Sequence, residues 1–131
     1  MHHTSNLGQL AKGVAAYLVQ IGESRFYPGS LGALFDTGVI KDKSVFVSPV
    51  DPDPPMLPDG LACSFESGFD KFATVRFSDD FRGCMMIWDR KPFFGSQRYV
   101  AYFDYRVERV DELAFERLRR EVLEKAVKNK R

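Results

Sequence analysis

Histidine occurs only at His2 and His3, at the very start of this chain of 131 residues. A Ser-His-Asp triad, a Cys-His dyad or a histidine-containing zinc site therefore has no histidine within the body of the domain. The two cysteines are too few to form a structural zinc site unaided. Glycine-rich phosphate-binding motifs are absent as well. These gaps argue against an enzyme.

Long apolar runs and an excess of one charge are also missing. The longest nearly apolar stretch, residues 14–21, is far too short to span a bilayer, which needs about 20 residues. The net charge of +1 gives no general attraction to nucleic acid. We interpret residues 1–3, with their two histidines after Met1, as a cloning remnant and residues 4–131 as one domain.

The first strong pattern is a helix after Ser5. Apolar residues recur at helical spacing up to Ile21, and Thr4 or Ser5 can serve as N-cap. Gly8 and Gly13 each cost about 1 kcal/mol in a helix relative to alanine, so a close backbone approach is expected there. The partner is either a neighbouring helix in a bundle or a sheet that covers the small residues. The predicted buried face consists of Leu10, Val14, Tyr17, Leu18 and Ile21.

A proline-rich segment separates this helix from a set of strands. Before it, Ser30 is predicted to cap a short helix that ends near Gly38, and residues 45–47 read as extended. Residues 49–58 are too rich in proline for a helix or a central strand, so they form a stiff loop. Strands are predicted at residues 72–77, 84–88, 98–103 and 106–110.

The last element is a helix with Asp111 as N-cap. Its narrow apolar stripe is Phe115, Leu118, Val122 and Ala126. The order of elements predicts an α+β fold. We expect a long N-terminal helix packed on an antiparallel meander of three to five strands, followed by a C-terminal helix.

Several short motifs resemble the soluble head of type IV pilin-like proteins, among them the pseudopilins of type II secretion. The motifs are Ser5-Asn6-Leu7, Phe26-Tyr27-Pro28, residues 45–49 followed by Asp51, residues 87–90, and residues 100–104 followed by Val107-Glu108. The chain departs from the family pattern at Ser48, where cysteine is common, at Tyr105, where glycine is usual, and at Arg106, where histidine is usual.

The resemblance implies a non-catalytic structural subunit of a pilin-like or type II secretion assembly. The helix near Leu7, Leu10, Lys12 and Val14 would pack in the filament core, and the partners would be other pilin-like subunits. The parent protein would be anchored by a preceding hydrophobic helix, with this domain on the periplasmic, extracytoplasmic face of the inner membrane. The chain as given would then be soluble.

Cys63 and Cys84 allow two interpretations. They are either two small buried thiols or one disulfide that closes a loop of about twenty residues and contributes roughly 3 kcal/mol. A disulfide requires an oxidising compartment, and the resemblance to pilin-like proteins supplies one.

Two binding sites are also conceivable. The acidic proline loop, with Asp51, Asp53 and Asp59, offers oxygen ligands for calcium, although the sequence favours a rigid acidic loop without metal. The acidic pair Asp79-Asp80 reads as a solvated turn. An alternative function is a small extracytoplasmic module that binds a ligand or protein through an aromatic groove. That groove would be lined by Trp88, Phe93, Phe94, Tyr99 and Tyr102.

Overall fold

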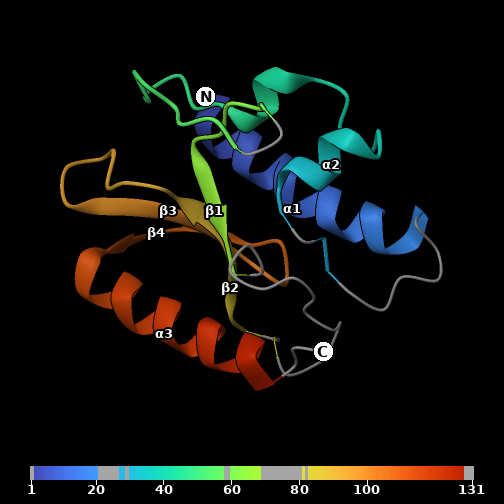
Figure 1. Cartoon of the computed structure of the whole chain (residues 1–131). Coiled ribbons are helices and arrows are strands. Elements are labelled where there is room, and N and C mark those ends of the chain that lie inside the picture. Colours follow the sequence, from blue (N-terminus) through green and yellow to red (C-terminus); the bar gives the residue numbers. More distant parts are fainter. Residues whose placement is uncertain are drawn as a thin grey trace.

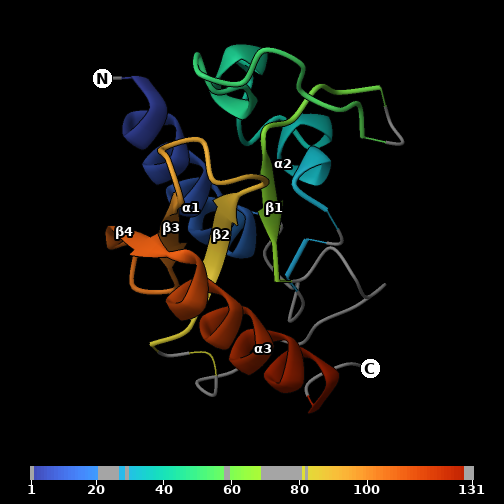
Figure 2. The ribbon, with the colours of Figure 1, turned by 90° about the vertical axis from the view of Figure 1, so that its left-hand side faces the viewer.

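The computed structural model describes residues 2–20, 27–28, 30–57, 60–68, 81 and 83–128. The described strands form an antiparallel sheet in the order β1-β2-β3-β4. Helix α1 covers one face of this sheet and helix α3 covers the other (Figures 1 and 2). The elements are α1 (His2–Gln20), α2 (Gly32–Asp36), the 3-10 turn η1 (Lys43–Phe46), β1 (Phe65–Ser67), β2 (Met85–Asp89), β3 (Gln97–Tyr102), β4 (Val107–Asp111) and α3 (Glu112–Lys128).

Helix α1 begins earlier than the sequence pattern predicts. It runs from His2, so Thr4 and Ser5 lie inside the helix and the prediction that either is the N-cap is wrong. Its first turns are tied to η1 instead. The side-chain amide of Asn6 donates to the backbone carbonyls of Ser44, at 3.3 Å, and Val47, at 3.0 Å. This tertiary anchor stabilises the early turns.

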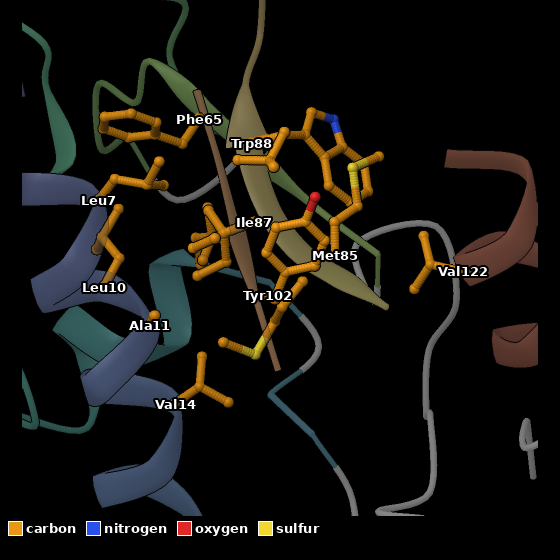
Figure 3. Close-up of a cluster of buried hydrophobic side chains, with 14 of the residues drawn as sticks. Leu7, Leu10, Ala11, Val14, Phe65, Met85, Ile87, Trp88, Tyr102 and Val122 are labelled. Carbon is orange, nitrogen blue, oxygen red and sulfur yellow. The ribbon is translucent and has the colours of Figure 1, made fainter. Parts of the chain in front are cut away.

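The buried face of α1 confirms part of the prediction. Leu10 and Val14 are no more than 1 % exposed, and so is Leu7. Tyr17 and Leu18 are only partly buried against the core, and Ile21 lies outside the described residues. Figure 3 shows Leu7 and Leu10 pointing from α1 towards Phe65 and Ile87 of the sheet. The face is therefore shifted towards the start of the helix.

The segment after α1 differs from the prediction at two points. The N-cap of α2 is Leu31, without a side-chain cap, so Ser30 does not have that role. Val45 and Phe46 belong to η1 rather than to an extended segment. The reason is local, because the carboxylate of Asp42 accepts a hydrogen bond from the backbone N–H of Ser44 at 2.9 Å and starts the turn.

Strand β2 is the central element of the core. All five of its residues are buried, because α1 packs over one side and α3 over the other. Figure 3 shows Ile87 on the side of α1 and Trp88 on the side of Val122 in α3. Strands β2, β3 and β4 confirm the predictions at 84–88, 98–103 and 106–110 within about one residue.

The strand expected at residues 72–77 lies outside the described residues. Strand β1 was not predicted, because three residues are too few to establish an alternating pattern. It pairs with β2, with Glu66 opposite Trp88.

Helix α3 follows β4 directly and is capped as predicted. The Asp111 carboxylate accepts a hydrogen bond from the backbone N–H of Ala114 at 2.8 Å. Phe115, Val122 and Ala126 are buried, while Leu118 is partly buried. The ring of Phe115 meets Trp88 edge to face, with centroids 6.0 Å apart. The predicted apolar stripe is thus the surface that α3 buries on the sheet.

Candidate interaction surfaces

The proline loop is fixed to the sheet by Arg90, which directly follows β2. Its guanidinium donates twice to the Asp51 carboxylate, at 2.8 and 2.7 Å, and once to the backbone carbonyl of Asp53, at 3.0 Å. The Asp51 side chain is fully buried and that of Arg90 is 16 % exposed. The hydrogen bond from Arg90 holds the pKa of the Asp51 carboxyl below its usual value.

Within the described residues, this arrangement gives no support to the predicted calcium site. Asp51 already has a cationic partner, and Asp53 contributes its backbone carbonyl to the same arginine. Asp59 lies outside the described residues. In the described part of the chain, no three acidic, histidine or cysteine side chains come together as metal ligands. Arg90 could have been suspected from its place at the end of an apolar run, where a charge needs a partner.

The cysteines are not joined in a disulfide. Cys63 and Cys84 are both buried thiols, which matches the first of the two sequence interpretations. The Cys63 thiol donates to the backbone carbonyl of Phe65 at 3.3 Å. Burial raises the pKa of the Cys84 thiol, so this thiol resists ionisation.

The predicted aromatic groove is not formed by its five residues. Trp88 and Tyr102 are 1 % and 4 % exposed and belong to the core. Burial and a hydrogen bond from Tyr102 to Glu108 raise the pKa of Tyr102 to about 12. Phe94 and Tyr99 pack edge to face with centroids 4.9 Å apart, and Arg109 lies over both rings. A cluster of rings already covered by arginine is a poor ligand groove.

The residues predicted for assembly divide into two sets. Leu7, Leu10 and Val14 are buried within the domain itself, so the prediction that they contact a neighbouring subunit is wrong for this structure. Lys12 is exposed on the opposite side of α1. Its neighbour Gly8 has open space around it, because a Cβ added there would meet nothing within 4 Å. Gly13 differs, since its Cβ would lie 2.6 Å from Ile40 Cδ1.

The hairpin between β3 and β4 contains a strained tyrosine. The backbone N–H of Tyr105 donates to the Tyr102 carbonyl at 2.9 Å, and the Tyr102 N–H donates to the Arg106 carbonyl at 2.9 Å. This is a three-residue hairpin loop whose third position requires the left-handed conformation that favours glycine. Tyr105 occupies it with φ of 70° and is 45 % exposed.

The outer face of α3 is hollowed and carries exposed apolar residues. Leu113 and Val127 are 86 % and 58 % exposed. An open hollow of about 540 Å³ near the start of the helix is lined by Asp111, Leu113, Ala114, Glu116, Arg117 and Arg120. Its two acidic and two basic side chains balance, so the hollow does not favour a partner of either charge.

Comparison of the chain with models of protein families, with curated proteins and with solved structures found no match. None of the described helices is long and apolar enough to cross a membrane.

Proposed function

We propose that this domain is the head of a pilin-like structural subunit, of the kind found in type II secretion pseudopili, and that it acts by assembly rather than by catalysis. The observation that carries the proposal is that the two glycines of α1 have different surroundings. Gly13 permits the close approach of Ile40, whereas Gly8 has open space in the domain. Gly8 weakens the helix by about 1 kcal/mol relative to alanine, and a neighbouring helix that packs closely there would offset this cost.

The rest of the exposed face of α1 suits packing against another helix. It carries Ser5, Gln9, Lys12 and Val19, and only one of these is charged. Covering its polar side chains requires hydrogen-bond partners on the other helix, but only Lys12 requires a partner for a charge. The opposite face is already buried on the sheet, so assembly would not require the head to unfold.

In this proposal, the parent protein carries a hydrophobic helix before α1 and resides in the inner membrane. The head then faces the periplasm, and the partners are other pilin-like subunits. The regular helical conformation from His2 onwards is compatible with a continuous helix.

The proposal is tested with the parent protein in its native cell. Cell fractionation should place it in the membrane, and cross-linking should join it to copies of itself or to other pilin-like subunits. Gly8→Leu and Lys12→Glu should reduce the cross-linked products without lowering the melting temperature of the head, because a Cβ at Gly8 meets open space and Lys12 is exposed. Lys128→Glu is the matched control, since Lys128 is exposed and lies on α3, across the sheet from α1.

Three results would contradict the proposal. They are a parent protein that remains unassembled, equal cross-linking of all variants, and a catalytic activity of the purified head.

The alternative of an aromatic binding module has less support. Two of its five rings are in the core, and no observation in the described residues favours it over assembly.

A further inference from the structure

We infer that β4 carries a second interaction surface, at which its outer edge pairs with β4 of another copy of this chain in antiparallel orientation, centred on Val110. The contact goes beyond the proposed function and does not involve α1. Strand β4 is the last in the order of the sheet, so among the described residues one of its two sides has no neighbouring strand.

The outer edge of β4 presents free backbone N–H groups. Across the hairpin, the Tyr102 N–H donates to the Arg106 carbonyl at 2.9 Å, and in the register of β3 and β4 every second residue of β4 bonds to β3 in this way. Val107, Arg109 and Asp111 are the residues between, so their N–H groups point away from β3. In the described part of the chain, none of these N–H groups has a backbone acceptor. A strand that lies alongside β4 in the plane of the sheet is the protein partner that satisfies such a row.

The charged side chains of this edge fit a second copy of β4. Arg109 and Asp111 share one face of the sheet, because alternate residues of a strand point the same way, and neither forms an ion pair within the described residues. In a pair centred on Val110, Arg109 of each copy lies opposite Asp111 of the other, which stabilises the sheet. The two adjacent registers are unfavourable, since a centre at Arg109 opposes two arginines and a centre at Glu108 opposes two glutamates. Charges on edge strands usually prevent pairing, but in the Val110 register those of β4 favour it.

The same register shields apolar side chains. Val110 meets its own counterpart at the centre of the pair, and Leu113 follows Asp111 by two residues, in the first turn of α3. In antiparallel pairing, Leu113 comes beside Val107 of the other copy. Leu113 is 86 % exposed in the single chain, so the contact removes an apolar side chain from water.

Pairing of two identical edges closes at a dimer. A two-fold axis relates the copies, and the contact leaves no second edge of the same kind free. Because the axis reverses the direction of the strands, it also reverses that of α1, whereas subunits anchored in one membrane carry α1 in the same direction. The dimer is thus a state of the free head and is separate from the proposed assembly.

The experiment uses the chain of 131 residues in solution. Sedimentation equilibrium between about 10 μM and 1 mM should show a monomer–dimer equilibrium. Hydrogen exchange followed by NMR should show that the amides of Arg109 and Asp111 exchange at least about tenfold more slowly at the highest concentration, whereas β3 protects those of Glu108 and Val110 throughout. Arg109→Glu places like charges opposite Asp111 and should lower the dimerisation constant at least about tenfold. Lys128→Glu makes the same change of charge at an exposed position near the end of α3 and should leave the constant unchanged.

Two results would overturn the β4 contact directly. They are a chain that stays monomeric at about 1 mM, and a dimer in which the amides of Arg109 and Asp111 exchange as fast as in the monomer. A dimerisation constant that Arg109→Glu leaves unchanged would also contradict it. Should Arg109→Glu fail to fold by circular dichroism, the exchange rates of the unmodified chain decide. None of these results bears on the proposed function, which is tested by cross-linking of the parent protein in its native cell.

Discussion

Helices α1 and α3 cover opposite faces of one sheet, yet their outer surfaces differ sharply. More than half of the residues of α3 are charged, whereas Lys12 is the only lysine, arginine or acidic residue in α1. A helix that remains in water gains from a dense set of charges on its outer face. The sparsely charged outer face of α1 is instead suited to being covered. In the proposed assembly, α3 would remain at the surface and α1 would be covered by a neighbouring helix.

The largest effect should come from the apolar layer of α1. Leu10 is fully buried, so Leu10→Ala should lower the free energy of unfolding by roughly 3–5 kcal/mol. Leu113→Ala is the matched control on α3, where the side chain is 86 % exposed, and should change stability by less than about 0.5 kcal/mol. Urea denaturation measures both values. Similar losses of unfolding free energy for the two variants would contradict the distinction between a buried inner face and an exposed outer one.

The ion pairs that link the sheet to the two layers should also differ in their contribution to stability. Arg90 links the sheet to the loop that packs with α1, and its partner Asp51 is fully buried. Removing that carboxylate with Asp51→Ala should cost about 2–3 kcal/mol, because Arg90 is left without its partner in a mostly buried site. Arg98 links the sheet to α3 through Glu112, which is 38 % exposed. Glu112→Ala should therefore cost less than about 1 kcal/mol in the same denaturation experiment.

The Asp51 pair also predicts a dependence on pH. Because Arg90 lowers the folded-state pKa of Asp51, the stabilisation is fully present above the unfolded-state pKa and is lost as the pH falls through the folded-state value. Wild type should lose more stability than Asp51→Asn when the pH is lowered from about 5 to 2. Parallel acid unfolding curves for the two proteins would contradict the assignment.

A smaller effect is expected at the start of α3. Asp111 caps the helix, and Asp111→Ala should lower the free energy of unfolding by about 1 kcal/mol. Asp111→Asn retains a capping oxygen and should lose only a few tenths. Thermal melts of both variants test this. Equal losses would show that the charge of Asp111, rather than its cap, stabilises the helix.

The sequence predicts regular elements well where the pattern is local and long. The cap at Asp111, the apolar stripe of α3 and the three strands from β2 to β4 depend on neighbouring residues, and all appear in the structure. Contacts between distant residues were not predicted. Asp51 lies 39 residues from Arg90, so the charge of the loop suggested calcium when the actual partner was an arginine.

The buried face of α1 shows a second limit. The helical period identified Leu7, Leu10 and Val14 as apolar, but apolar spacing does not distinguish a sheet in the same chain from a neighbouring subunit. The structure assigns these side chains to the sheet. The left-handed backbone conformation of Tyr105 could have been predicted from sequence, because a three-residue hairpin loop with tyrosine at the glycine position is recognisable once both strands are assigned.

The smallest expected effect concerns the two glycines of α1 and tests the comparison most directly. Gly8→Ala adds a methyl group in open space, so helix propensity alone should raise the stability of the isolated head by about 0.5–1 kcal/mol. Gly13→Ala gains the same propensity but forces Ile40 Cδ1 to move from a 2.6 Å contact, so its net effect should be near zero or destabilising by about 1 kcal/mol. Thermal melts of the isolated head measure both.

The same two variants in the parent protein then separate folding from assembly. If α1 packs closely against another helix at Gly8, Gly8→Ala should weaken cross-linking between subunits although it stabilises the head, because the added methyl group holds the helices apart. Gly13→Ala should change cross-linking only as far as it changes folding, since Gly13 faces Ile40 inside the domain. A Gly8→Ala protein that is more stable and assembles as well as wild type would show that no close contact forms at Gly8. That result would remove the main reason for proposing that another helix covers the outer face of α1.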